Sequence, residues 1–505
     1  MGGKKVTFNS IHFLIFFPVV VLIYFLIPQK IKWIWLLISS YYFYMSWNPK
    51  YVVLIAFSTV ITWLGGRGIE KIEQLKSIEK KTMWKKVCLW SCLLSNLAIL
   101  GFFKYYHFFA DNISRLFGRL GVEVSIPVID VLLPVGISFY TFQALGYLID
   151  VYRGTIKAEK NLFRYALFVS FFPQLVAGPI ERSGNLIQQL HEPHYFDEER
   201  VVRGLLMMGW GFFKKLVIAD RAALLVTGVY DNFTDYTGLQ IIFATIVFAV
   251  QIYCDFSGYS DIAVGAAQVM DFKLMENFHN PYFSRSVSEF WRRWHVSLST
   301  WFRDYVYIPL GGNRHGKQMK YRNLLITFGL SGLWHGASWN YVVWGVLNGF
   351  YQIVGDFTLK FRQKLRNVLH INTECWSYSF FQGILTFALI DFSWLFFRAV
   401  SLKQALLMIL HTIRNFGPIS MLDTSRILGI QTLILDEKDF YVLLIAVLIL
   451  IVVDRLKEKV QLRTFILKQN LVFRYLVYYM IIFTVLIFGI YGPEFDASSF
   501  IYFQF

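Results

Sequence analysis

The sequence predicts an all-α, polytopic integral membrane protein. The chain is 56% hydrophobic and 19% aromatic, and only 16% of its 505 residues are charged, whereas about 25% are charged in soluble domains. Windows without Asp, Glu, Lys or Arg recur along the chain, and many approach the length of a membrane span. Basic residues are concentrated between these windows, as expected for charges that set membrane topology.

The apolar windows predict the helices in order. The longest charge-free window is 323–355, and the others are 11–27, 33–49, 51–66, 87–103, 131–149, 165–180, 237–254, 376–390, 440–453 and 475–493. We expect about 11–13 transmembrane helices, together with re-entrant and amphipathic helices. Pro28 and Asn48-Pro49 should end helices. Because no polar interval is long enough for a soluble domain, we expect one membrane domain over 1–505, with a core motif region at about 131–355.

The net charge of +16 reflects topology rather than nucleic-acid binding, because the basic residues lie in loops between apolar segments. The interval 67–86 has seven Lys/Arg against three Glu. If this loop is cytoplasmic, three preceding spans place the amino terminus outside the cytoplasm. No cleavage site follows the first apolar run, so we expect that helix to be retained in the cell membrane.

Neither the cysteines nor the paired histidines predict a metal site. Cys88 and Cys92 lie one helical turn apart, but we expect them to be small packing residues. His191 and His194 have a spacing that resembles a metal motif. Pro193 between them disfavours the helix that would aim both rings at one ion, so we expect a surface loop there.

His335, in the run Gly332-Leu333-Trp334-His335-Gly336, is the first candidate for chemistry. It lies inside the charge-free stretch 323–355, which is long enough for more than one membrane crossing. An ionisable group at that depth is costly unless it faces a polar cavity, so such residues are frequently functional. A neutral imidazole that is hydrogen-bonded within a helix bundle remains the structural alternative.

His295 is the second candidate. In the segment 289–305, apolar residues recur at three- and four-residue intervals, which predicts one helical face. His295 falls on that face beside Trp291 and Trp294, while the arginines lie to its sides. An interfacial amphipathic helix with a core histidine is the alternative.

Two further polar groups accompany the histidines. We expect Asp255 and Asp261 to cap a helix or to pair with an arginine rather than to act on a substrate. The basic loop that contains His315, Lys317 and Lys320 could attract the phosphates of a coenzyme or an acidic carrier protein, or could simply set topology. Motifs of soluble hydrolases, Walker loops, dinucleotide fingerprints and His-Glu-x-x-His are absent from the sequence.

Several blocks resemble the membrane-bound O-acyltransferase family, most closely its bacterial branch that O-acetylates alginate and related exopolysaccharides. The blocks that carry the resemblance are Phe172–Ile180, Asp255–Asp261, Phe290–His295 with its continuation to Arg314, Leu333–Ala337 and the ending Phe500–Phe505. They are ordered, rich in tryptophan and distributed over nearly the whole chain.

The resemblance implies a fold and an activity. The fold would be a ring-like bundle of tilted helices around a central tunnel. His335 corresponds to the catalytic histidine of the family and His295 to its polar partner, and we expect the substrate tunnel to be lined by Trp334, Trp291, Trp294, Arg303, Asn313 and Gly336. Members of the alginate type pass acetyl groups to an extracytoplasmic serine-esterase-like protein, so the resemblance also implies such a partner.

The expected reaction is transfer of an acetyl group from a cytoplasmic thioester to polysaccharide hydroxyls. The donor would be acetyl-coenzyme A or a carrier-protein thioester that acts as substrate, with no bound cofactor and no metal. His335 would act as general base, His295 would orient a substrate, and Gly332 and Gly336 would let a thin donor arm approach the backbone. D-alanyl transfer to teichoic acid and a polysaccharide or proton transporter are the alternatives.

Overall fold

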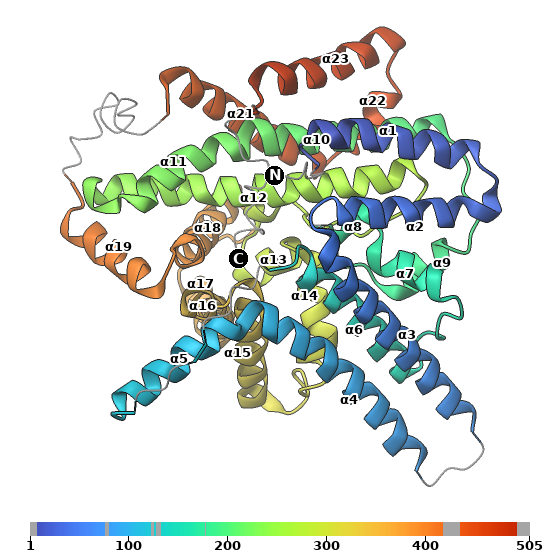
Figure 1. The fold of residues 1–505 in the computed structure, drawn as a ribbon. Helices are drawn as coiled ribbons and strands as arrows, with labels where there is room; N and C mark the ends of the chain where they lie inside the picture. Colours follow the sequence, from blue (N-terminus) through green and yellow to red (C-terminus); the bar gives the residue numbers. More distant parts are fainter. Residues whose placement is uncertain are drawn as a thin grey trace. The chain divides into compact units, whose positions relative to one another are not determined.

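The regular structure of the chain is helical. A computed structural model describes residues 8–75, 80–122, 126–127, 133–176, 178–417 and 435–491, and no β-strand occurs among these residues. They divide into two compact units, and Figure 1 draws and labels their helices. The all-α class is therefore confirmed, while a single domain over 1–505 stays a prediction. The terminal block Phe500–Phe505 lies outside the described residues.

The first unit comprises Met1–Leu205 and Ile262–Met275. Pro28 is the N-cap of its second helix, and the Asn48 side chain accepts a hydrogen bond from the Lys50 amide where a short turn begins, so both predicted breaks are confirmed. The helices of this unit are α1 (Ile11–Leu26), α2 (Gln29–Met45), α3 (Val52–Gln74), α4 (Lys81–Leu100), α5 (Tyr106–Arg119), α6 (Ile137–Arg153), α7 (Leu162–Ser170), α8 (Phe172–Leu175) and α9 (Ser183–Gln189).

Small residues allow α3, α4 and α6 to pack closely. A Cβ atom at Gly65 of α3 would lie 2.6 Å from the Cys92 sulfur of α4. The thiols of Cys88 and Cys92 each donate a hydrogen bond to a backbone carbonyl of α3, at 3.5 Å. Both cysteines therefore pack between helices, as the sequence predicted.

The second unit comprises Leu206–Asp261 and Glu276–Phe505. The unit boundaries cross two helices, α10 (Glu198–Phe212) and α12 (Gly238–Val269). The other helices of this unit are α11 (Asp220–Asp231), α13 (Val287–Arg293), α14 (Val296–Phe302), α15 (Gly316–His335), α16 (Trp339–Phe357), α17 (Leu359–Val368), α18 (Trp376–Arg398), α19 (Leu402–Arg414), α21 (Glu437–Lys457), α22 (Leu462–Leu467) and α23 (Leu471–Phe488).

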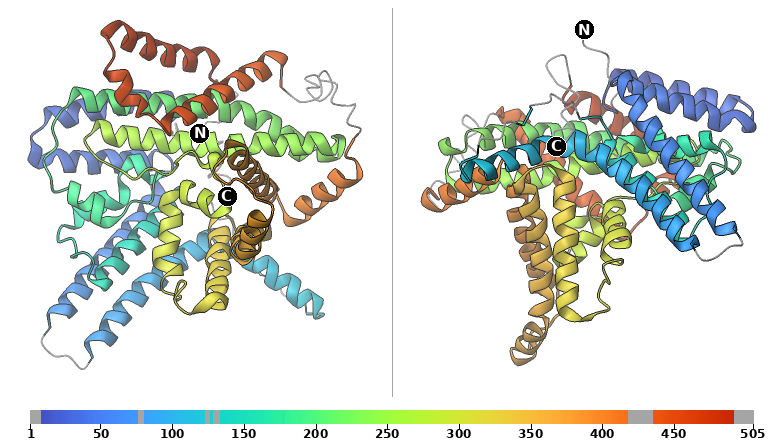
Figure 2. Two further views of the ribbon diagram at one scale, coloured as in Figure 1. Left: turned by 180° about the vertical axis from the view of Figure 1, so that it is seen from behind. Right: turned by 60° about the horizontal axis from the view of Figure 1, so that its bottom comes forward.

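The long charge-free stretch forms an antiparallel hairpin of α15 and α16, which run side by side in Figure 2. Two glycines bring the backbones together: a Cβ at Gly332 would lie 2.2 Å from the Tyr341 carbonyl oxygen, and one at Gly345 would lie 2.2 Å from that of Phe328. Such close approach of small residues stabilises helix pairs in membranes. At the open end of the hairpin, Lys320 and Asp356 form an ion pair at 2.8 Å.

The chain is a multi-pass membrane protein. Among the described residues, five helical segments are long and apolar enough to cross a membrane: Pro49–Gln74, Lys81–Arg119, Gly238–Val269, Trp376–Arg398 and Leu471–Phe488. The helix α1 is apolar but shorter. Several predicted windows lie on shorter helices, such as α2 with 17 residues and α7 with 9 residues. The total of about 11–13 spans therefore stays a prediction.

Candidate active site

His295 lies at a break between two short helices. The sequence predicted one continuous helix over 289–305, and this prediction was wrong, because α13 ends at Arg293 and α14 begins at Val296. His295 has a left-handed backbone with φ of 41°. For a residue other than glycine, this conformation costs about 1–3 kcal/mol and is frequent at functional sites. The periodicity did not reveal the break because apolar side chains continue on both of its sides.

Asn277 holds the chain in this broken conformation. Its backbone carbonyl accepts a hydrogen bond from the Val296 amide at 3.0 Å, and its side-chain oxygen accepts one from the Ser297 amide at 3.2 Å. These bonds satisfy two amides at the start of α14 that would otherwise be without intrahelical partners. The side chain of Asn277 is buried, and the sequence analysis did not identify it as part of the site.

His335 is the last residue of α15, and its side chain is buried. Its ring centroid lies 5.0 Å from that of Trp344 on α16 and 5.3 Å from that of Phe397 on α18. Both contacts are edge-to-face, the geometry that aromatic pairs favour. Three helices of the second unit thus fix the position of this imidazole.

The two histidines share one neighbour, Trp334. The ring centroids of His295 and Trp334 are 6.0 Å apart, and those of Trp334 and His335 are 4.9 Å apart. His295 also contacts Phe256 of α12 at 4.6 Å. The two imidazoles, forty positions apart in the sequence, thus lie beside the same tryptophan. Their roles as catalytic residue and polar partner stay predictions.

Tryptophans enclose this region. Trp294 stacks on Phe290 at 5.4 Å and contacts Trp394 at 5.1 Å, and Trp344 stacks on Trp394 at 5.7 Å. The Trp291 indole N–H donates a hydrogen bond to the side-chain oxygen of buried Asn348 at 3.2 Å. An apolar aromatic enclosure of this kind limits the access of bulk water to the histidines.

Of the remaining predicted tunnel residues, two are exposed and one serves helix packing, and their place in a tunnel stays a prediction. Arg303 is exposed and pairs with Asp304 at 2.8 Å, and Asn313 is exposed in the turn before α15. A Cβ at Gly336 would lie 2.2 Å from the Tyr341 ring. The Tyr341 ring fills the space beside Gly336, and the Tyr341 carbonyl group fills the space beside Gly332. Neither glycine therefore leaves room for a donor arm. Their small size serves the packing of α15 against α16.

The basic loop is not adjacent to His335. His315 and Lys317 lie at the start of α15, whereas His335 is its last residue. Since a helix rises 1.5 Å per residue, about 30 Å of helix separates the two ends. The basic loop is thus far along the helix from the imidazole, and its attraction of donor phosphates or of a carrier protein stays a prediction.

A buried ionic cluster in the second unit involves both aspartates that the sequence singled out. Lys215 lies 2.8 Å from Asp220 and 2.6 Å from Asp255. Lys214 lies 2.8 Å from Asp261 and donates a hydrogen bond to the Ser257 hydroxyl at 2.8 Å. Pairing of Asp255 and Asp261 with basic residues is thus confirmed, but the bases are lysines rather than arginines. No spacing in the sequence distinguishes these lysines from loop charges.

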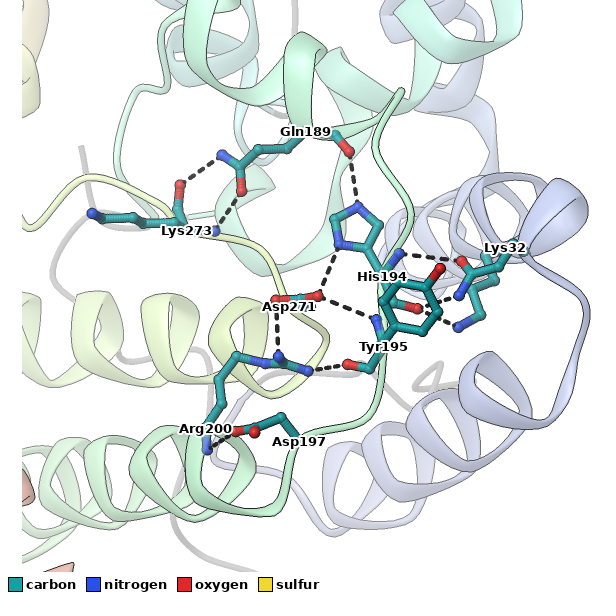
Figure 3. Close-up of polar contacts among 9 residues, drawn as sticks. Lys32, Gln189, His194, Tyr195, Asp197, Arg200, Asp271 and Lys273 are labelled. Carbon is teal, nitrogen blue, oxygen red and sulfur yellow. Dashed lines mark hydrogen bonds and ion pairs between the residues drawn. The ribbon is translucent and has the colours of Figure 1, made fainter.

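In the first unit, His191 and His194 lie in a non-helical loop whose other residues are exposed, while the His194 side chain is buried in a polar network (Figure 3). Its ring forms a hydrogen bond with the Gln189 carbonyl at 2.8 Å and lies 3.5 Å from the Asp271 carboxylate. Asp271 also forms an ion pair with Arg200 at 3.1 Å. Lys32 donates a hydrogen bond to the His194 carbonyl at 2.8 Å. The predicted surface loop is confirmed, but the burial of the His194 side chain was not predicted, because the contacts that cover it are distant in sequence.

Comparison with known proteins identifies the class of this chain. The membrane-bound O-acyltransferase family matches residues 156–402, which include both histidines and the Asp255–Asp261 block. The chain belongs to this family and is an acyltransferase of the membrane. The family assignment predicted from the tryptophan-rich blocks is confirmed.

Individual relatives extend the similarity beyond the matched region. The chain is 39% identical to a protein named probable alginate O-acetylase AlgI of Pseudomonas syringae, over 79% of this chain and 73% of the relative. It is 34% identical to the peptidoglycan O-acetyltransferase of Helicobacter pylori, over 79% and 78% of the two chains. It is 31% identical to the teichoic acid D-alanyltransferase of Streptococcus thermophilus, over 45% of this chain and 57% of the relative.

Proposed function

We propose that the chain transfers acetyl groups from a thioester donor to hydroxyl groups of an extracellular polysaccharide of the alginate type. The observation that carries the proposal is the pair of buried imidazoles, His295 and His335, which share Trp334 inside an aromatic enclosure. The names of the two relatives with the broader coverage, an alginate O-acetylase and a peptidoglycan O-acetyltransferase, support an acetyl group and a glycan acceptor.

In the proposed reaction, His335 acts as general base. One ring nitrogen takes the proton of the acceptor hydroxyl while the hydroxyl oxygen attacks the thioester carbonyl. The new C–O bond forms, the C–S bond breaks, and the thiolate leaving group receives the proton from the imidazolium. An imidazole can both accept and release a proton, and general base catalysis typically contributes about 10²–10⁴-fold.

His295 orients a substrate in this proposal. Its strained backbone and its contact with Phe256 hold the ring in one place before any substrate binds. Such preorganisation avoids an ordering cost during the reaction. Exclusion of water by Trp294, Trp344 and Trp394 limits wasteful hydrolysis of the thioester.

The surroundings of the reaction are also part of the proposal. Thioesters are made in the cytoplasm while the polymer lies outside, so the chain would accept acetyl-coenzyme A or a carrier thioester from the cytoplasmic side through a tunnel. An extracytoplasmic serine-esterase-like partner would complete the transfer to the sugar. The chain would lie in the cell membrane with its amino terminus extracytoplasmic, as the basic interval 67–86 favours.

Transfer of D-alanine to teichoic acid is the second candidate, and the similarity to a D-alanyltransferase favours it. That similarity covers less than half of this chain, whereas the similarity to the acetylating relatives covers about four fifths. Acetyl transfer is therefore the better supported of the two chemistries.

The test measures esters on cell-surface polysaccharides. Cells that produce the wild-type chain or His335→Ala are given deuterated acetate, mild base releases ester-linked acids, and mass spectrometry identifies them per amount of membrane-embedded protein. We expect labelled acetate from the wild type and its loss in the variant at equal protein abundance. Release of alanine instead would favour D-alanyl transfer, and unchanged esters with export of polymer would favour a transporter.

A further inference from the structure

The lysine cluster of the second unit joins α12 to a π-helical turn, Phe213–Ala219. Lys215, Asp220 and Asp255 are all almost completely buried, and one ammonium group lies between two carboxylates. A π-helical turn is rare and is frequently found at functional sites. Burial of three charged groups has a large desolvation cost, which only well-formed ion pairs and hydrogen bonds offset. The cluster therefore depends on the exact placement of its three side chains.

A glycine allows the two backbones to meet at this point. A Cβ at Gly258 of α12 would lie 2.8 Å from the Gly211 carbonyl oxygen and 3.2 Å from the Lys215 amide nitrogen. The ammonium of Lys214 reaches Ser257 and Asp261 on either side of this contact. Ion pairs and direct backbone contact therefore hold α12 against both rotation about its axis and sliding along it.

The residue between these ionic contacts faces the candidate active site. Phe256 follows Asp255 and precedes Ser257, and its ring packs edge-to-face against His295 with centroids 4.6 Å apart. The same ring contacts Phe278 at 5.0 Å, just after Asn277, which caps α14. A ring of the buried ionic segment thus forms one wall against the imidazole.

Small movements of α12 would be passed directly to His295. A phenylalanine ring lies about 6 Å from the axis of its helix, so a rotation of ~10° moves the ring by ~1 Å. A misplacement of 1 Å in an active site can lower the rate by about 10²-fold. The ionic contacts on both sides of Phe256 oppose this rotation.

We propose that the ionic cluster of Lys214, Lys215, Asp220, Asp255 and Asp261 consists of positioning residues that orient His295 through Phe256. This inference rests on the proposed function, in which His295 contacts a substrate. The cluster touches neither donor nor acceptor in this account. Its effect on the acyl transfer rate passes through the contact of Phe256 with His295, and the inference is therefore testable by substitutions in the cluster and at Phe256.

The test uses the deuterated-acetate assay in intact cells. Asp255→Asn keeps the side-chain volume and leaves Lys215 paired with Asp220, so the chain should still fold. Phe256→Leu removes the ring, whereas Phe256→Tyr retains it. The matched control is Asp439→Asn, which breaks the ion pair between Asp439 of α21 and Arg221. Arg221 follows Asp220 in the sequence, but this ion pair is not part of the cluster. Membrane abundance and the thermal unfolding midpoint in detergent are measured for each variant.

We expect Asp255→Asn and Phe256→Leu each to lower the labelling rate by about 10–100-fold at near-wild-type abundance. The double variant should be no more than about threefold slower than the slower single variant, because both changes act through the same contact. Phe256→Tyr and Asp439→Asn should stay within about threefold of the wild type. A merely structural role would lower abundance and would not be rescued by tyrosine.

Two results would overturn the inference: a wild-type rate in Asp255→Asn, or a double variant whose loss equals the product of the single losses. His295→Ala separates this failure from that of the proposed function. If His295→Ala keeps the wild-type rate, the proposed site itself is wrong. If it abolishes labelling while Asp255→Asn and Phe256→Leu act independently, only the positioning role of the cluster is wrong.

Discussion

Substitution of Gly332 by alanine is the sharpest perturbation of the helix pair that carries His335. The added Cβ would lie 2.2 Å from the Tyr341 carbonyl oxygen and 3.2 Å from the Gly345 Cα. Since real Cβ contacts are rarely shorter than about 3.2 Å, α15 and α16 must separate by about 1 Å near the last turn before His335. Overpacking of this kind costs about 1–3 kcal/mol.

The same displacement moves His335 relative to Trp344, whose ring lies 5.0 Å away on α16. We therefore expect the acetate labelling rate to fall by about 10–100-fold. Gly329→Ala is the matched control on the same helix, because its Cβ would lie 3.6 Å from Val346, an ordinary contact. This control should keep its rate within about twofold and gain about 0.5–1 kcal/mol of stability.

Labelling rates are compared after correction for membrane abundance, and thermal unfolding in detergent is followed in parallel. Wild-type labelling rates in both Gly332→Ala and Gly329→Ala would refute the reasoning, because the close approach at Gly332 would then have no consequence at His335. An equally lowered rate in both variants would refute it as well, since an effect of helix composition alone would explain the result.

Three further changes test other parts of the site. Asn277→Ala should destabilise the chain by about 1–3 kcal/mol and slow labelling at least tenfold, because the buried Ser297 amide loses its acceptor; a thermal scan and the labelling rate check this. Trp291→Phe should cost about 1 kcal/mol through the lost bond to Asn348, measured as a lower unfolding midpoint with a smaller effect on rate. Asp356→Asn, which removes the partly exposed ion pair with Lys320, should change stability by less than about 1 kcal/mol and leave labelling unaltered.

Composition predicted the class of fold, and the tryptophan-rich blocks predicted the family. The roles of His295 and His335 stay predictions. The hairpin of α15 and α16 follows from a charge-free stretch that is too long for one crossing, with a short break after His335. The pairing of Asp255 and Asp261 with basic residues was predicted because isolated carboxylates are costly inside a membrane protein. These inferences depend on local sequence and on the energetics of burial.

The errors concern features that depend on contacts distant in sequence. The break at His295 is stabilised by Asn277, and nothing in the apolar period of 289–305 encodes that contact. The glycines near His335 were predicted to admit a donor, but Tyr341 from the next helix fills that space. The burial of the His194 side chain was not predicted because the sequence did not show that Asp271 and Phe272 lie against it.

The most direct test of the account compares His335→Gln with the wild type. Glutamine keeps a polar side chain of similar reach but cannot accept and release a proton as imidazole does. At matched membrane abundance, we expect base-labile deuterated acetate on the envelope polysaccharides to accumulate at least 10²-fold more slowly in the variant. Accumulation at the wild-type rate would contradict general base catalysis by His335 and with it the proposed chemistry of this site.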